Sequence, residues 1–346
     1  MELKKEFLSK LGNYKVISII GLAKNVSKTT TLNFIIKNLK DYKLGLTSIG
    51  RDGEKYDVIT RFPKPRIFIK KGTIIATARQ SYERSKIKMK LLKTTEYNTP
   101  LGEILILKAL GDGFIELAGP SINKYLQEVC LELKGLDCDL ILIDGAFDRR
   151  SYATPIISDA TILSTGASVS ENLQNVINLT IHTIELLNLN SEKNQRIIEI
   201  AKNILSKSKI GIIESQNSIV LLDVLTSLDS AKEISANLTE NSKYVVIKGA
   251  ITDKLLEDLM KKSNKCRGVT FLVEDATKLF LNKKIKDKFQ KKGGFLKVLT
   301  PMNIIAITIN PTSPYGYNFN KNDFLNLLKE KTNIPVYDLG VDNRFC

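Results

Sequence analysis

Residues 21–30, GLAKNVSKTT, are the segment from which the fold of this chain is predicted, because a strand-like run precedes them and a helix-like run follows them. The apolar run YKVISII at 14–20 precedes them and is typical of a strand buried on both faces. Residues 29–39 follow, with leucine and isoleucine at helical spacing. A strand, a loop and a helix in this order are the context of a phosphate-binding loop, in which backbone N–H groups at a helix N-terminus form an anion site.

The side chains at the end of this loop suit a nucleotide that carries Mg²⁺. Lys28 is expected to reach the β- and γ-phosphates, the Thr29 hydroxyl to ligate Mg²⁺, and Thr30 to contact an α-phosphate oxygen. The base-reading motif NKxD of GTPases is missing, which favours ATP. The residues that this hypothesis assigns to nucleotide binding are Gly21, Lys24, Asn25, Ser27, Lys28, Thr29 and Thr30.

Ser27 departs from the pattern GxxxxGK[ST], which has glycine before the lysine. A Cβ at this position either hinders the approach of the loop to phosphate or requires a φ angle that serine adopts poorly. The sequence therefore predicts a phosphate-binding loop whose nucleotide affinity or geometry is altered at Ser27.

Two acids follow predicted strands and are assigned as catalytic and metal-binding residues. Asp144 ends the apolar run CDLILID, and P-loop proteins use such an aspartate to hold Mg²⁺ directly or through water. Asp52 follows a strand predicted at 44–49, so it is expected at the same carboxyl-terminal edge of the sheet, where α/β proteins bind ligands. There it would position Mg²⁺ or water, with Glu54 as the alternative. Thr29, Asp52 and Asp144 are the predicted metal ligands.

Other polar residues near the loop have weaker assignments. Glu116 ends a further short strand, which is expected at the same edge. An arginine would stabilise charge during phosphoryl transfer, and the sequence does not choose among four candidates. These four are Arg51, Arg79, Arg149 and Arg150. His182 lies among apolar residues of a predicted helix, so a packing or surface role is favoured over catalysis.

The rest of the chain alternates predicted strands and helices, which implies parallel strands with helices on both faces. Residues 66–77 are predicted to form a hairpin, and Ser121 to cap a helix. The predicted fold class is α/β: a P-loop NTPase-like domain over 1–190, followed by a second α/β domain over 191–346. The boundary lies in a polar stretch and divides two parts of the same α/β character.

Composition excludes several classes of protein. The chain has 346 residues, of which 43% are hydrophobic and 26% charged, which is ordinary for a globular protein. The apolar runs are too short to span a bilayer, and no secretory signal is recognised, so a cytoplasmic protein without a membrane partner is expected. One histidine and no CxxC pair argue against a structural zinc site.

The net charge of +15 comes from two segments. Residues 64–93 hold ten Lys or Arg and one acid, a net of +9, and residues 278–297 hold eight Lys and one acid, a net of +7. Phe68 and Tyr82 are the only aromatics interleaved with the first set, so a stacking platform for nucleic acid is disfavoured. Docking onto an acidic protein is the favoured use of these segments.

Several strings in the chain resemble one family. They are GLAKNVSKTTTLN at 21–33, LGLTSIGRDGE at 44–54, TPLG at 99–102, IELAGPS at 115–121, LILIDGAFDRRS at 140–151, ATILSTGASVS at 160–170, NPTSPYGYNF at 310–319 and IPVYDLG at 334–340. Together they resemble the KamB family of reactivase subunits for the cobalamin-dependent lysine 5,6-aminomutase. Members of that family tend to show GLAKNAGKTT, from which Ser27 departs. More broadly, the first half is similar to the SIMIBI class of P-loop proteins, which includes dethiobiotin synthetase and MinD.

The resemblance implies an ATP-binding subunit that works with a second reactivase ATPase subunit. Together they would restore lysine 5,6-aminomutase after its damaged cobalamin has become stuck, and ATP would drive release of that cofactor. The alternative is a small-molecule kinase or ligase that resembles dethiobiotin synthetase, with an acceptor bound by the C-terminal half.

Overall fold

The computed structural model describes residues 2–52, 66–145, 153–224, 230–262 and 265–340. The chain forms two compact units. The first combines Met1–Ile181 with Asn303–Cys346, and the second is His182–Met302. This division differs from a single cut near residue 190, because the last segment of the chain returns to the first unit. It does so through the strand β19 (Ile304–Asn310), which pairs in parallel with β11 (Ala160–Gly166).

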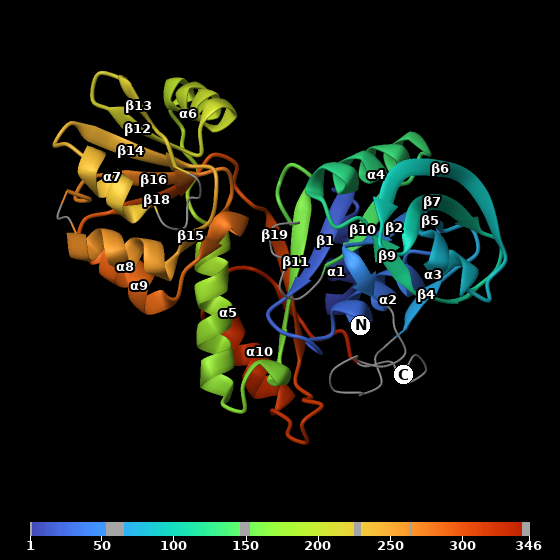
Figure 1. Ribbon diagram of the computed structural model, residues 1–346. Helices are drawn as coiled ribbons and strands as arrows, with labels where there is room; N and C mark the ends of the chain where they lie inside the picture. The colour runs from blue at the N-terminus through green and yellow to red at the C-terminus, as the bar shows by residue number, and fades with distance from the viewer. Residues whose placement is uncertain (1, 53–65, 146–152, 225–229, 263–264, 341–346) are drawn as a thin grey trace. The chain divides into compact units, whose positions relative to one another are not determined.

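The first unit is built on a mostly parallel sheet, which confirms the predicted α/β class. Within the described ranges this sheet has nine strands in the order β20-β19-β11-β1-β10-β2-β5-β7-β6 (Figure 1). The strands from β20 to β5 run parallel, and β7 and β6 are added antiparallel at one end. Their remaining bounds are β1 Val16–Gly21, β2 Leu44–Ser48, β5 Ile74–Ala78, β6 Met89–Thr99, β7 Gly102–Ala109, β10 Leu140–Asp144 and β20 Val336–Tyr337.

Helices pack on both faces of this sheet because alternate strand residues point to opposite sides. On one face a core cluster joins the buried residues of α1 and α2 to strand residues such as Ile17 and Leu142. On the other face α4 packs on Ile141, Ile143 and Ile106. The helices with residues in this unit are α1 Glu2–Leu11, α2 Lys28–Asn38, α3 Arg79–Glu83, α4 Asn123–Gly135, α5 Leu173–Leu187, which continues into the second unit, and α10 Lys321–Lys329.

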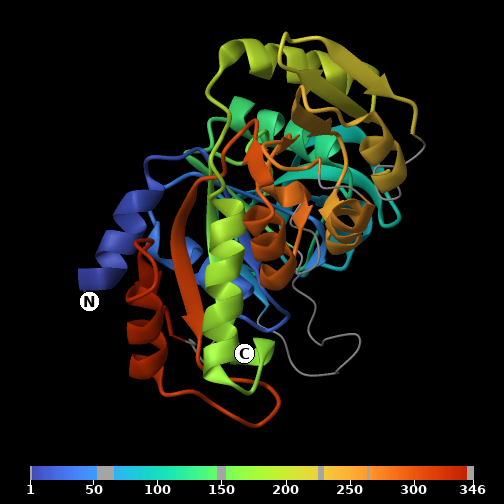
Figure 2. The ribbon, with the colours of Figure 1, turned by 90° about the vertical axis from the view of Figure 1, so that its left-hand side faces the viewer.

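The first helix and the last strand of the described residues are in contact in the first unit. Helix α1, the blue helix next to the label N in Figure 2, packs against β20, where the rings of Phe7 and Tyr337 are 5.1 Å apart between centroids. The Tyr337 hydroxyl donates a hydrogen bond of 3.1 Å to Glu6 Oε1. The sequence analysis did not predict α1, and this contact shows how its apolar residues are buried.

Two short antiparallel ribbons lie outside the main sheet. β3 (Gly50–Asp52) pairs with β9 (Leu117–Gly119), and β4 (Ile67–Ile69) pairs with β8 (Gly113–Ile115). The hairpin predicted at 66–77 is therefore wrong, because β4 and β5 pair with other strands on either side of the turn. The predicted cap at Ser121 is also wrong: α4 begins after Ile122, with no side-chain cap.

The second unit has its own sheet with the order β13-β12-β14-β16-β18 in the described residues. β14, β16 and β18 are parallel to one another, and β12 is antiparallel to both of its neighbours, β14 and β13. Helix α6 packs on one face through Ile197, Ala201 and Ile204. The bounds in this unit are α6 Gln195–Lys207, β12 Ile210–Glu214, β13 Ile219–Leu222, α7 Ala231–Asn237, β14 Ser242–Ile247, β15 Ile251–Thr252, α8 Asp253–Lys262, β16 Thr270–Val273, β17 Leu279–Phe280, α9 Lys283–Lys291 and β18 Phe295–Val298.

No helix in the described part of the chain has both the length and the apolar character needed to cross a bilayer.

Candidate nucleotide-binding site

The loop between β1 and α2 is held in a compact turn at the carboxyl-terminal edge of the sheet. Leu22 N donates to the Ser164 carbonyl at 3.0 Å, which fixes the start of the loop on β11. Thr31 N donates to the Ser27 carbonyl at 2.9 Å, which closes the first turn of the helix. Both Asn25 and Ser27 have positive φ, 59° and 68°. The chain therefore turns sharply twice before the helix begins.

Ser27 adopts the left-handed conformation, with φ 68° and ψ 30°, directly before α2. This conformation costs a non-glycine residue about 1–2 kcal/mol because its Cβ approaches the carbonyl oxygen. Its hydroxyl makes no capping hydrogen bond that offsets the cost. Of the two effects considered for this position, the structure shows the unfavourable φ. The loop thus has a glycine-like backbone at the position where the phosphate-loop pattern has glycine.

Gly21 leaves space that the loop uses. A Cβ on Gly21 would lie 2.6 Å from Val26 Cγ2 and 3.0 Å from Lys28 Cδ. The stem of Lys28 therefore passes directly over Gly21, and its Nζ donates to the Ala23 carbonyl at 3.2 Å. The ammonium group of Lys28 is thus held over the loop, where it is expected to meet a phosphate. Thr29 and Thr30 follow it on the first turn of the helix, both partly exposed.

Asp144 lies beside the strand that leads into the loop. β10 is the neighbour of β1, and Asp144 pairs in register with Ile19, two residues before Gly21. Gly145 N donates to the Ile19 carbonyl at 2.9 Å, which joins the ends of the two strands. The Asp144 side chain is completely buried. The tertiary structure thus brings together the loop and the acid that the sequence placed on separate strands.

Asp52 ends β3, whose partner β9 places Leu117 opposite it. Glu116 directly precedes Leu117, so the backbone positions of Asp52 and Glu116 are neighbours on this ribbon. The structure describes only the backbone of Asp52 and of Arg51. Glu54, Arg149 and Arg150 lie outside the described residues.

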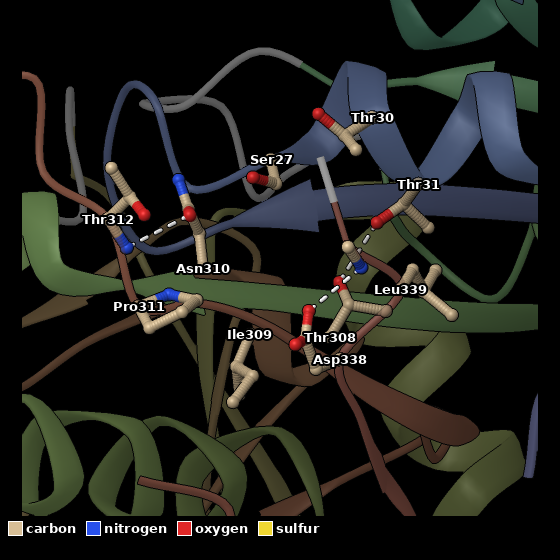
Figure 3. Close-up of a pocket in the computed structure, with 11 residues that line it drawn as sticks. Ser27, Thr30, Thr31, Thr308, Ile309, Asn310, Pro311, Thr312, Asp338 and Leu339 are labelled. Atoms are coloured by element: carbon tan, nitrogen blue, oxygen red, sulfur yellow. Dashed lines mark hydrogen bonds between the residues drawn. The ribbon is translucent and has the colours of Figure 1, made fainter. Parts of the chain in front are cut away.

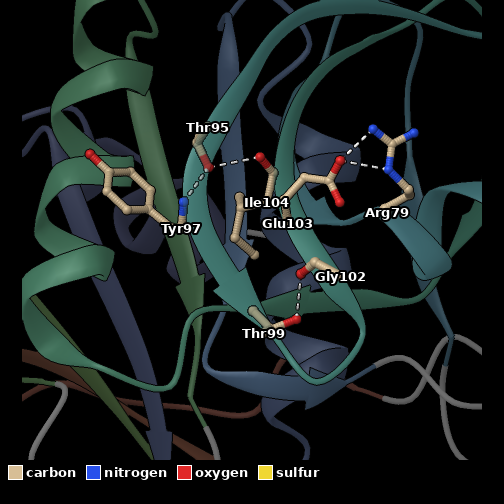
Figure 4. Close-up of polar contacts among 7 residues, drawn as sticks. All are labelled: Arg79, Thr95, Tyr97, Thr99, Gly102, Glu103 and Ile104. Atoms are coloured by element: carbon tan, nitrogen blue, oxygen red, sulfur yellow. Dashed lines mark hydrogen bonds and ion pairs between the residues drawn. The ribbon is translucent and has the colours of Figure 1, made fainter.

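Two further residues considered from the sequence make structural contacts. Arg79 begins α3 and donates through Nε and Nη2 to Glu103 on β7, the Nε distance being 2.7 Å (Figure 4). This ion pair already engages its guanidinium group. His182 belongs to the second unit, where its buried Nε2 lies 2.7 Å from the Leu281 carbonyl oxygen. That contact agrees with a packing role.

A pocket next to the loop is lined largely by residues that the sequence analysis did not assign. It has a volume of about 130 Å³ and lies between the start of α2 and the segments around the ends of β19 and β20 (Figure 3). Its lining residues are Ser27, Thr30, Thr31, Thr308, Ile309, Asn310, Pro311, Thr312, Asp338, Leu339 and Gly340. The signals available in the sequence were two strings quoted above, NPTSPYGYNF at 310–319 and IPVYDLG at 334–340.

Asn310 ties this pocket to the loop. Its Nδ2 donates to the Asn25 carbonyl at 3.0 Å, and its Oδ1 accepts from Thr312 N at 3.1 Å (Figure 3). Below it, Thr31 Oγ1 donates to Thr308 Oγ1 at 3.1 Å. The C-terminal segment at 304–312 therefore supports both the loop, through Asn25, and the start of α2, through Thr31.

Comparisons with protein-family models, with curated proteins and with solved structures found no match for this chain. The arrangement of the site is thus the basis for its interpretation. It combines a loop with a left-handed residue before a helix, a lysine over that loop, a buried acid on the next strand and an adjoining pocket.

Proposed function

We propose that the first unit binds ATP, with its phosphates in the loop at 21–30. The observation that carries this proposal is the left-handed backbone conformation of Ser27, directly before the N-terminus of α2. Successive N–H groups around such a left-handed residue typically form an anion-binding concavity, and at a helix N-terminus the helix dipole also favours an anion. Lys28 adds the positive charge that a triphosphate requires.

The residues at this edge fit a magnesium ion. Mg²⁺ prefers oxygen ligands and is usually held by one or two carboxylates together with substrate phosphates. Thr29 supplies a hydroxyl and Asp144 a carboxylate from the adjacent strand, with Asp52 as the further acid on the neighbouring ribbon. The ion would neutralise charge on the phosphates. The protein side chains would fix its position and hold the nucleotide against the loop.

The adjoining pocket supports a nucleoside in this proposal. It opens directly from Ser27 and Thr30, so a nucleotide whose phosphates occupy the loop could extend into it. Asp338 stands at its far side, where Lys321 Nζ contacts its Oδ2 at 2.5 Å and Gly340 N donates to its Oδ1 at 2.8 Å. These bonds fix the carboxylate at the pocket wall.

The proposed biological role is that of a reactivating subunit for lysine 5,6-aminomutase. It rests on the strings that resemble the KamB family, and it makes ATP binding the source of energy for releasing damaged cobalamin. The partners would be the aminomutase and a second reactivase ATPase subunit.

The direct test is ATP binding by the Lys28→Ala variant, measured by calorimetry. We expect binding to fall to an undetectable level while the circular dichroism spectrum stays unchanged, because Lys28 is a partly exposed residue at the very start of α2. Lys40→Ala, an exposed lysine just after the same helix, is the matched control and should bind ATP like the parent chain. Unchanged ATP affinity in Lys28→Ala would refute the phosphate role.

The biological role has a separate test. ATP hydrolysis is measured for the chain alone, and then with the aminomutase and the second subunit. A rise that requires both partners supports the reactivase. Transfer of phosphate from ATP to a small acceptor without those partners would instead support the kinase or ligase alternative.

A further inference from the structure

A basic surface lies where the strand β6 begins. Lys86, Lys88 and Lys90 are exposed, whereas Ile87 and Met89 between them pack against the core. The three lysines therefore alternate with apolar residues that anchor the chain. Lys90 belongs to β6, whereas Lys86 and Lys88 lie in the segment directly before it.

The neighbouring strand β7 adds a further positive charge to this surface. Lys90 stands directly opposite Lys108 on β7, and both are exposed. Like charges in opposite positions of a strand pair are destabilising. The fold thus retains a positive potential here at a cost to its own stability.

This surface lies away from the nucleotide site. Lys108 pairs with both Lys90 and Ile74, the first residue of β5, so the surface is at the amino-terminal end of the parallel strands. The loop at 21–27 follows the carboxyl-terminal end of β1. A molecule bound at the basic surface would leave the loop accessible.

The edge of β6 offers a second element of recognition. β6 is the last strand of its sheet, and within the described ranges no strand pairs with its outer edge. Its later part is engaged by α4, since Lys93 Nζ contacts Glu132 Oε1 at 2.5 Å. Its first residues are not covered in this way, and Leu91 is 50% exposed. Unpaired N–H and C=O groups on an edge strand are a template for an added strand.

A hollow beside the start of β6 provides an apolar contact. It is lined by Tyr82, Ile87, Met89 and Leu110 together with Glu83, Ser85 and Lys88. Leu110 is 48% exposed, and its backbone N donates to the Lys88 carbonyl at 2.9 Å. An extended segment along β6 would thus meet lysines at one set of positions and apolar side chains nearby.

We propose that residues 86–91, which lead into β6 and form its start, bind an acidic, extended segment of a partner protein, which adds to the sheet as a further strand. Its carboxylates face Lys86, Lys88 and Lys90, and its intervening apolar side chains contact Leu91 and the hollow. A lysine-rich edge also discourages aggregation between copies of a chain. That protective role requires charge of either sign, whereas recognition of an acidic segment requires positive charge.

The test uses a fluorescein-labelled nine-residue peptide that alternates glutamate and valine. A control peptide of the same charge has proline in place of each valine, which removes the N–H groups needed for strand pairing. The variant Lys86→Glu/Lys88→Glu/Lys90→Glu is compared with Lys284→Glu/Lys288→Glu/Lys291→Glu on α9. Each variant replaces three lysines with glutamates, so the two carry the same change in charge. All six lysines are exposed, so neither change buries a charge.

We expect the edge variant to bind the glutamate–valine peptide at least about tenfold more weakly than the parent chain, and the α9 variant to bind it like the parent chain. The proline peptide should bind at least about tenfold more weakly than the valine peptide to the parent chain. Equal weakening in both variants, full binding by the edge variant, or equal binding of the two peptides would overturn the proposal. Preferential binding of a single-stranded DNA oligonucleotide, lost in the edge variant, would also overturn it by indicating a nucleic-acid surface.

Two further measurements keep folding and function separate. Lys90→Glu alone replaces a like-charge pair with an opposite pair, so its thermal midpoint should rise by about 1–3 °C while peptide binding falls. ATP binding should stay unchanged in the edge variant, which makes this proposal independent of the proposed nucleotide function. A thermal midpoint that falls together with ATP binding would mean that these lysines support the fold and would overturn the proposal.

Discussion

Replacing Ser27 with glycine tests the backbone geometry at the centre of the candidate site. The residue is held at φ 68° and ψ 30°, which costs serine about 1–2 kcal/mol and glycine almost nothing. Glycine loses more conformational entropy than serine on folding, which costs about 0.5–1 kcal/mol and offsets part of the relieved strain. The net expectation for Ser27→Gly is that the free energy of unfolding rises by about 0.5–1 kcal/mol.

Two control variants separate backbone strain from the loss of the hydroxyl. Ser27→Ala removes the hydroxyl, which makes no capping bond, and keeps the Cβ that causes the strain, so no gain in stability is expected. Asn25→Gly relieves φ 59°, but asparagine tolerates this region better, so its gain should be smaller than that of Ser27→Gly.

The assay is urea unfolding followed by circular dichroism, with thermal unfolding beside it. For a unit of this size, the thermal midpoint of Ser27→Gly should rise by about 1–4 °C. ATP affinity should be kept or increased, because the loop geometry is unchanged and less strained. An equal gain in Ser27→Ala, or a loss of stability in Ser27→Gly, would refute the reasoning from backbone strain.

Three other substitutions follow from the contacts described above. Gly119→Ala should prevent folding of the first unit or lower the thermal midpoint of that unit by more than 10 °C, because the alanine Cβ would overlap a main-chain oxygen of β2. Size-exclusion chromatography and thermal unfolding check this. Asn310→Ala should weaken ATP binding several-fold through the lost bond to Asn25, with a stability loss of only about 1 kcal/mol, as calorimetry and urea unfolding would show. Burial raises the pKa of Glu192, but hydrogen bonds from two backbone amides and from Lys297 outweigh it and hold this pKa below its ordinary value. The stability that Glu192 contributes is therefore present above about pH 4.5 and is lost as the pH falls through its lowered pKa. Glu192→Gln should lower the free energy of unfolding at pH 7 and make that free energy decline less steeply in acid. Urea unfolding at several pH values would show both effects.

Much of the central fold could be predicted because its signals are local. The buried strands at 16–21 and 140–144 read as continuous apolar runs, and the helix after the loop has its own periodicity. The adjacency of Asp144 to the loop follows once both strands join one parallel sheet. The departure at Ser27 was visible in the sequence, and its two physical consequences could be stated. The structure decided that the backbone keeps the glycine-like conformation.

The errors have a common physical cause. The hairpin at 66–77 was inferred from a turn between two apolar segments, yet β4 and β5 each have a better partner distant in sequence. The strand β6 was missed because its alternation of apolar and polar residues breaks at Leu91 and Leu92, where a bulge also shifts its register. Strand pairing is a property of the whole sheet, so a short segment does not specify its own neighbour.

The sequence by itself determined the α/β class, the loop at 21–30 and the acid at the end of the neighbouring strand. These features depend on burial periodicity and on the residue types that one turn requires, which are encoded over ten or so residues. Only the tertiary structure decided that Asn310 and Asp338 wall the same pocket as Ser27, because β19 and β20 rejoin the first sheet after the second unit. It also decided that Lys90 and Lys108 stand opposite one another. Both results arise from backbone pairing between segments that are distant in the sequence. A local pattern of side chains does not specify such pairing.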